Sequence, residues 1–165
     1  MGLSSWAAAA FKCGPRDRWV GWSGSQQRRR LRFVANNSRF LVLPETRRAN
    51  LASRLLARNL RRLANDWEAR HGHPVVLAEA FVGQCFRGSC HLGAGWCALG
   101  QTRGSGRNRG RDYHHGQPKT ILVKEVMSKG RAWLTPSTPL WPAIPRASLA
   151  LTSATCSGGT VRPPQ

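Results

Sequence analysis

The clearest pattern in the chain is an apolar run, an amphipathic stretch and a second apolar run in succession. Residues 39–43 are almost continuously apolar, which is typical of a strand covered on both faces. Residues 51–70 carry leucines and a tryptophan at helical spacing, and they predict a helix that Asn50 caps and Gly72 ends. Residues 74–82 are again apolar. Strand, helix and strand in this order predict a βαβ unit in a parallel or mixed sheet.

The patterns that precede this unit are weaker. Residues 3–11 are small and apolar, and they predict a strand. Residues 13–17 contain Gly and Pro, which set the backbone of a turn, and residues 18–22 predict a further short strand.

A short basic helix is predicted next. It covers residues 26–35, with Ser23 or Ser25 as its cap. Asn36 and Asn37 are expected to end it, because asparagine competes for backbone hydrogen bonds and tolerates left-handed conformations.

After the βαβ unit, the pattern predicts two more strands separated by a loop. A short segment covers residues 88–95, and a strand covers residues 96–102. Residues 103–111 are rich in Gly and Arg and predict a loop, and residues 120–126 predict a last strand.

The final part of the chain has a different composition. The last 40 residues hold 6 of the 10 prolines and no acidic residue, and they show no periodicity. Such a segment buries too little apolar surface to offset the entropy of ordering it. We therefore expect one α/β domain over residues 1–126, with a mixed central sheet and flanking helices, and a disordered, basic, Pro-rich tail over residues 127–165. The tail is more typical of out-of-frame translation than of a selected linker.

Charge points to a class of partner. The chain has 26 Lys and Arg against 7 Asp and Glu, which gives a formal net charge of +19. This excess repels itself and is tolerated best beside a polyanion, so nucleic acid or a phosphate-bearing ligand is the expected partner. A high-GC genome that encodes Arg freely is the alternative explanation.

The same composition argues against a membrane protein. The apolar runs are far shorter than the roughly 18–20 residues that span a bilayer, and the first residues form a poor secretory signal. The five cysteines are odd in number and too few for a secreted disulfide scaffold. We expect a cytoplasmic protein with no membrane partner.

The junction before the predicted long helix is suited to bind an anion. A helix N-terminus carries unpaired N–H groups and a partial positive charge, and two preceding arginines add bidentate donors. A pyrophosphate is the ligand that fits this arrangement. The candidate cofactor-binding residues are Arg47, Arg48, Asn50, Leu51 and Ala52. Alternatively, the two arginines are solvated loop charges.

Two short strings resemble the GNAT-type N-acetyltransferase fold. Arg47-x-x-Asn50-x-Ala52 resembles its pyrophosphate loop, Arg/Gln-x-x-Gly-x-Gly/Ala, and residues 91–96 resemble its Tyr-x-x-x-Gly-Phe signature. The resemblance implies that acetyl-CoA or another acyl-CoA binds, with His91 in the place of the Tyr that serves as general acid. Asn50 and His91 both depart from that pattern.

The Gly/Arg-rich stretch is the best direct candidate for binding nucleic acid. Flexible backbone with several arginines tracks phosphates without reading sequence. Its candidate residues are Arg103, Arg107, Arg109 and Arg111. The arginine face of the long helix is a second candidate, although such a face more often meets only solvent.

A metal site is not expected. Cys85, Cys90, His91 and Cys97 lack the Cys-x-x-Cys spacing of a structural zinc site, and buried free thiols are the simpler interpretation. A cysteine nucleophile paired with one of the two adjacent histidines 114 and 115 has no pattern that fixes its geometry.

A longer resemblance covers about residues 3–126. The runs 16–23, 36–44 and 50–53, with 86–91 and 100–111, are similar to the core of the DruA family. The resemblance implies a bacterial anti-phage defence role in the Druantia system, beside a large helicase-like partner. Relatives of the family also occur with transposase-like sequences.

Three hypotheses for the function follow. The first is a defence component that binds nucleic acid or a nucleoprotein partner, and the second is an acyl-CoA-dependent N-acyltransferase. The third is an inactive, transposase-associated remnant, because the chain resembles a fragment of the family, incomplete at its N-terminus and with a foreign tail.

Overall fold

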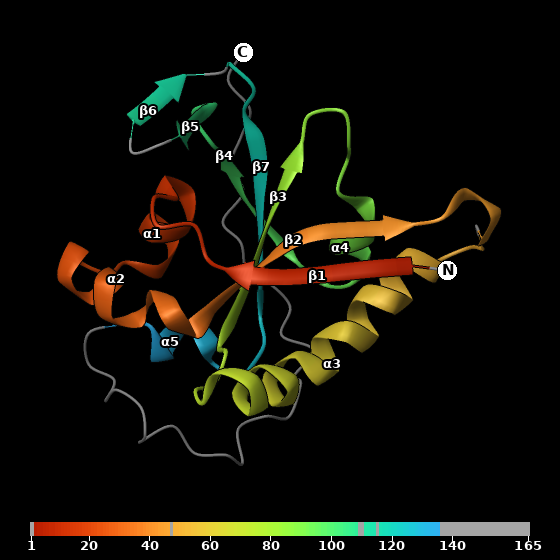
Figure 1. Cartoon of the computed structure of the whole chain (residues 1–165), viewed down its shortest axis with the longest axis horizontal. Helices are drawn as coiled ribbons and strands as arrows, with labels where there is room; N and C mark the ends of the chain where they lie inside the picture. Colours follow the sequence, from red (N-terminus) through yellow and green to blue (C-terminus); the bar gives the residue numbers. More distant parts are fainter. Residues whose placement is uncertain (1, 47, 109–110, 115, 136–165) are drawn as a thin grey trace.

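The computed structural model describes residues 2–46, 48–108, 111–114 and 116–135. These residues form an α/β fold in which a central sheet has helices on both faces (Figure 1). The expected fold class, a mixed sheet with flanking helices, is confirmed.

The central sheet has five strands in the order β1-β2-β3-β7-β4. Their bounds are Gly2–Ala8 (β1), Val34–Val42 (β2), Leu77–Gly83 (β3), Lys119–Glu125 (β7) and Cys97–Gln101 (β4). Only β2 and β3 pair in parallel, and the other neighbours are antiparallel. The sheet is therefore mixed. A helical crossover joins β2 to β3, and this is the one neighbouring pair that runs parallel.

That crossover is α3, Leu51–His71, and it confirms the predicted βαβ unit. Leu56, Leu60 and Leu63 are buried against the sheet, whereas the arginines of the helix are exposed. Gly72 ends the helix in a left-handed conformation, as predicted, and its N–H donates to the carbonyl of Glu68 at 2.8 Å. Asn50 precedes the helix with φ 58° and makes no side-chain cap, so the predicted capping hydrogen bond is wrong.

The opposite face of the sheet carries three short helices, α1 (Gly14–Val20), α2 (Gly24–Arg30) and α5 (Gly130–Trp133) (Figure 1). Ser23 caps α2 through a capping box with Gln26. The predicted basic helix is thus real, although it ends at residue 30. A one-turn helix, η1 (Leu31–Phe33), continues it to the sheet.

Three expectations for the N-terminal part are wrong. Residues 13–17 and 18–22 were expected to be a turn and a strand, but residues 14–20 form α1. Pro15 lies in the first turn of the helix, which its fixed φ suits, and Gly21 ends the helix at φ 80°. Asn36 and Asn37 do not break the chain but lie within β2, where β1 satisfies their backbone.

β2 and β3 diverge soon after they pair. Their register covers only residues 34–36 of β2 and 77–79 of β3, whereas β2 stays paired with β1 as far as Val42 (Figure 1). The outer half of β2 therefore has one neighbour, and Leu41 and Leu43 are 53% and 36% exposed. The expectation of a strand covered on both faces fails here.

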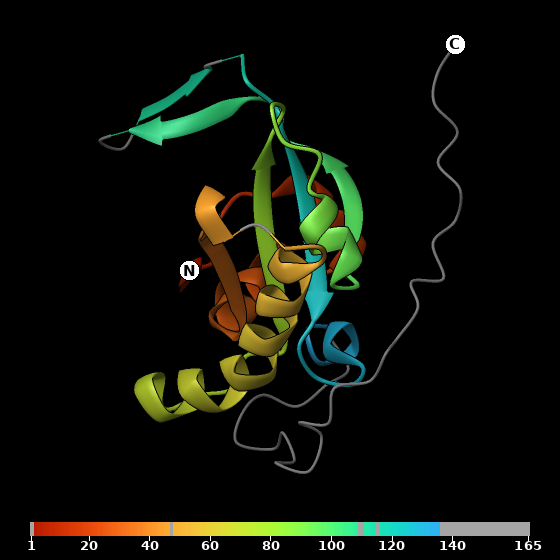
Figure 2. The ribbon, with the colours of Figure 1, turned by 90° about the vertical axis from the view of Figure 1, so that its right-hand side faces the viewer.

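The Gly/Arg-rich segment, expected to be a loop, contains a two-stranded antiparallel ribbon. β5 (Ser105–Asn108) pairs with β6 (Arg111–His114) and makes a sheet of its own. Figure 2 shows this ribbon projecting from the body of the molecule.

The folded part extends beyond the expected domain end at residue 126. Residues 127–135 contain α5 (Figure 2). Met127 and Leu134 of this segment are buried in the core. The expectation of disorder is therefore wrong for these nine positions, and residues 136–165 of the predicted tail lie outside the described residues. Within the described part of the chain, no helix is long and apolar enough to cross a membrane.

Candidate functional site

The fold brings together two segments that the sequence singled out separately. The short helix α4, Ser89–Gly93, packs on the first turn of α3. The contact is close: a Cβ on Gly93 would lie 2.9 Å from Ser53 Oγ. His91 therefore lies on the element adjacent to the predicted pyrophosphate-binding residues.

The first turn of α3 already uses one of its N–H groups. The Leu51 N–H donates to the Arg48 carbonyl at 3.1 Å, and Asn50 accepts from the Arg54 N–H at 3.0 Å. Arg48 and Asn50 are exposed, and Leu51 and Ala52 are partly buried. Arg47 lies outside the described residues. Binding of a pyrophosphate at this junction stays a prediction.

His91 is enclosed by the sheet and by two aromatic rings. It is 6% exposed and meets Phe40 and Trp96 edge to face, at centroid distances of 5.9 and 5.0 Å. Burial lowers its pKa below the ordinary value, so the ring is neutral at pH 7. A neutral imidazole is better suited to accept a proton than to act as the predicted general acid.

Both nitrogens of this ring have polar neighbours. Nε2 lies 3.4 Å from Asn37 Oδ1, and Nδ1 lies 3.4 Å from Cys90 Sγ. Asn37 comes from β2, immediately beyond the point where β2 leaves β3. Sequence reasoning placed Asn37 in a helix break and missed this contact, because only the pairing of β1 with β2 locates it.

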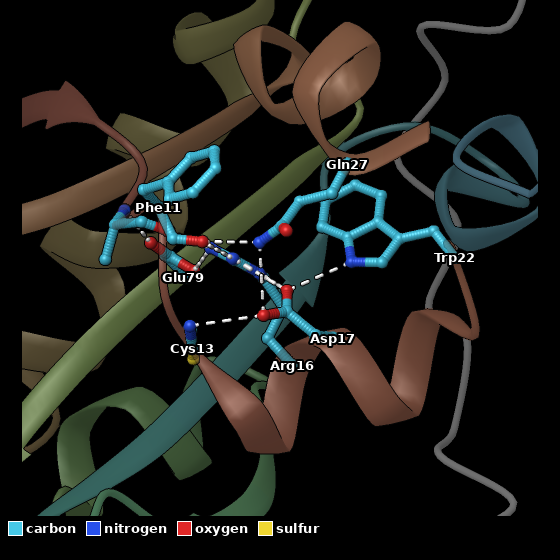
Figure 3. A network of polar contacts seen from close by, with 8 residues as sticks. Phe11, Cys13, Arg16, Asp17, Trp22, Gln27 and Glu79 are labelled. Carbon is cyan, nitrogen blue, oxygen red and sulfur yellow. Dashed lines mark hydrogen bonds and ion pairs between the residues drawn. The ribbon is translucent and has the colours of Figure 1, made fainter. Parts of the chain in front are cut away.

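A second polar cluster, the Arg16 network, is buried on the other face of the sheet (Figure 3). Arg16 is 0% exposed and forms ion pairs with Glu79 at 2.7 Å and Asp17 at 2.8 Å. It also donates to the Ala10 carbonyl at 2.8 Å, and the Ala10 N–H donates to Glu79 at 2.8 Å. Burial acts to lower the pKa of Arg16, but the two carboxylates outweigh it and raise that pKa.

The Arg16 network joins α1, α2 and the β1–α1 linker to β3. Trp22 Nε1 donates to Asp17 at 3.0 Å, and Gln27 donates to Asp17 and to the Phe11 carbonyl. Arg16 is paired with both Asp17 and Glu79, so we assign the cluster a structural role. No group of three potential metal ligands occurs in the described ranges.

The predicted nucleic-acid-binding arginines belong to the ribbon and its base. Arg103 is exposed, Arg107 lies on β5 opposite Asp112, and Arg111 lies on β6 opposite Asn108. Arg109 lies outside the described residues. The second candidate surface, on α3, has exposed arginines at positions 54, 58, 61 and 62.

Comparison with known proteins identifies one family. The family model described as Druantia protein DruA matches residues 1–111. No curated protein matches the chain. The matched span includes α1 to α4, the Arg16 network, His91 with its neighbours, and the first residue of β6.

Proposed function

The chain belongs to the DruA family of the Druantia anti-phage system, and on this premise we propose that it is a nucleic-acid-binding component of that system. The observation that carries the proposal is the projecting ribbon of β5 and β6, whose sequence is rich in Arg (Figure 2). A two-stranded ribbon is narrow enough to enter the major groove of DNA. Arginine neutralises phosphates there and releases counterions.

The net charge supports the same proposal. A formal charge of +19 draws a polyanion from a distance and accelerates its association. The ribbon then supplies a surface set apart from the core, so that contact with phosphates needs no rearrangement of the sheet. Binding by such contacts is strong at low salt and largely independent of sequence.

Salt dependence tests this function. We expect duplex oligonucleotides of unrelated sequence to bind with similar affinity, measured by fluorescence anisotropy. The logarithm of the binding constant should fall linearly with the logarithm of salt concentration, by about 0.9 per phosphate contact. A flat plot would exclude phosphate contacts and overturn the proposal.

A second candidate function is favoured by the packing of α4 on the first turn of α3. This contact packs α4, which carries His91, on the turn of α3 that follows Arg48 and Asn50, and it supports an acyl-CoA-dependent N-acyltransferase. Calorimetry with acetyl-CoA tests it. Binding that is lost in Arg48→Ala and kept in the matched α3 variant Arg61→Ala would support it, whereas no heat at millimolar ligand would remove it.

We also propose that the chain acts in the cytoplasm beside a helicase-like Druantia partner. Family membership motivates this proposal. Co-purification of the two proteins from the same cells, at high salt and after nuclease treatment, would separate direct contact from tethering by nucleic acid. Loss of the partner under these conditions would contradict direct contact.

A further inference from the structure

The orientation of the Asn37 side-chain amide is fixed by β1. Its Nδ2 donates to the Ser5 carbonyl at 3.3 Å and contacts Ser4 Oγ at 2.9 Å. A backbone carbonyl only accepts, so the NH₂ group of Asn37 must face β1. The Oδ1 atom therefore faces His91, and it acts as an acceptor.

This orientation fixes the tautomer of His91. Because Asn37 Oδ1 can only accept, His91 Nε2 carries the hydrogen and donates to it across 3.4 Å. In the neutral ring the other nitrogen, Nδ1, then has a free lone pair. That lone pair lies 3.4 Å from Cys90 Sγ, so the thiol donates and the imidazole accepts.

The three side chains form an ordered chain of a thiol, an imidazole and an amide. Asn37 is 6% exposed and His91 is 6% exposed, whereas Cys90 is a free thiol that is only partly buried. The outer member of the chain is thus the reactive one. This is the arrangement of an activated nucleophile, in which a base next to the thiol is itself oriented by a third group.

We propose that Cys90 is a nucleophile that accepts an acyl group from an activated ester or thioester, with His91 as its base and Asn37 as a positioning residue. The thiol proton passes from Sγ to His91 Nδ1 as Sγ bonds to the acyl carbon. The bond from that carbon to the leaving oxygen or sulfur breaks, and His91 returns the proton to the leaving group. Atoms and charges balance without a further reactant.

The surroundings of His91 are consistent with this role. The groups that face the ring are Phe40, Asn37, Cys90 and Trp96, and the titratable one among these described residues is Cys90. Lys124 of β7 lies near Gly95, which follows α4: a Cβ on Gly95 would lie 3.1 Å from Lys124 Nζ. Trp96 Nε1 is buried beside the ring without a hydrogen-bond partner among the described residues.

The inference is independent of nucleic-acid binding and of the predicted pyrophosphate site. It needs neither the ribbon nor Arg48, and a probe without phosphate tests it. Burial raises the pKa of Cys90, so without a base this thiol should react more slowly than an exposed one. A fast reaction at Cys90 would therefore have to come from His91.

The experiment treats the full chain with p-nitrophenyl acetate and follows acetylation of each cysteine by peptide mass spectrometry. Cys85, which is exposed and free, is the internal reference. We expect Cys90 to be acetylated at least about tenfold faster than Cys85 near pH 7, because a positioned base contributes at least this factor. An equal or slower reaction at Cys90 overturns the proposal.

The pH profile of the unmodified chain provides a second test. The rate at Cys90 should fall when His91 is protonated and reach a plateau below pH 7, because a neutral imidazole is the base. Because burial raises the pKa of Cys90, a reaction that needs its thiolate instead keeps gaining rate beyond the ordinary thiol pKa of about 8.5. That second profile at Cys90 would contradict the proposal. Nitrogen NMR of His91 should show the Nε2–H tautomer, and an Nδ1–H tautomer would also contradict it.

Variants separate the base from the positioning residue. His91→Gln should reduce the Cys90 rate to that of a buried thiol. Asn37→Asp keeps an acceptor for Nε2–H and adds a charge, so the midpoint of the pH profile should move upward. A purely structural role for Asn37 would leave that midpoint unchanged and would refute its positioning role.

Discussion

At the scale of single residues, the most costly group to bury is Arg16. Its side chain is fully buried, and the burial is tolerated because Glu79 and Asp17 form ion pairs with it within 2.8 Å. The sequence offered no signal for this arrangement, because Arg16 and Glu79 are 63 positions apart. Asp17 and Glu79, which are distant from each other in the sequence, share the guanidinium of Arg16.

Removing one partner of this pair should be strongly destabilising. Glu79→Gln leaves a buried guanidinium without its full counter-charge, and we expect a loss of about 3–5 kcal/mol in the free energy of unfolding. Asp66→Asn is the matched control, because the ion pair of Asp66 with Arg62 is exposed and contributes about 0–1 kcal/mol. Urea unfolding of both variants measures the difference, and similar losses would contradict a structural role for the Arg16 network.

Cys13 gives a pH dependence with a definite sign. Burial raises the pKa of its thiol from 9.0 to about 11 in the folded chain. Because the folded state holds this proton more tightly than the unfolded state, the stabilisation is complete below pH 9 and is lost as the pH rises towards 11. Cys13→Ala should remove this part of the alkaline slope in unfolding experiments. An unchanged slope would show that the thiol titrates normally.

At the scale of elements, the sequence predicted what is local and periodic. The β2–α3–β3 unit was found because α3 is long and amphipathic and its end signal, Gly72, is strong. α1 was missed because Gly14 and Pro15 suit a turn and a helix start equally well. The ribbon and α5 were missed because glycine has no side chain and so interrupts the hydrophobic periodicity by which strands and helices are predicted.

The candidate site was predictable only in part, for the same reason. His91, Arg48 and residues 50–52 were singled out from motifs, and the structure places α4 beside the first turn of α3. Asn37 could not be found from local patterns. Its contact with His91 spans 54 positions and depends on where β2 diverges from β3.

The docking of α5 depends on a glycine. A Cβ on Gly130 would lie 2.2 Å from the backbone carbonyl oxygen of Val76, which cannot rotate away. We expect Gly130→Ala to lower the free energy of unfolding by about 1–3 kcal/mol, because the added methyl must displace backbone. Gly24→Ala is the control, since no atom lies within 4 Å of its added Cβ. Equal thermal stabilities of the two variants would contradict this packing.

At the scale of the whole molecule, the two faces of the sheet carry different helices and different polar clusters. One face holds the Arg16 network and three short helices, which lock the N-terminal part to β3. The other face holds α3, α4 and the His91 chain. The ribbon stands apart from both (Figure 2), so nucleic acid and an acyl donor would meet different parts of the chain.

The most direct test of the nucleic-acid proposal compares two variants with the same loss of charge. Arg107→Gln with Arg111→Gln alters the ribbon, and Arg58→Gln with Arg61→Gln alters exposed positions of α3. We predict that the ribbon variant reduces the salt slope of duplex binding by roughly 1–2, whereas the α3 variant leaves it unchanged. Equal slopes for both variants, or a reduced slope for the α3 variant alone, would contradict binding by the ribbon.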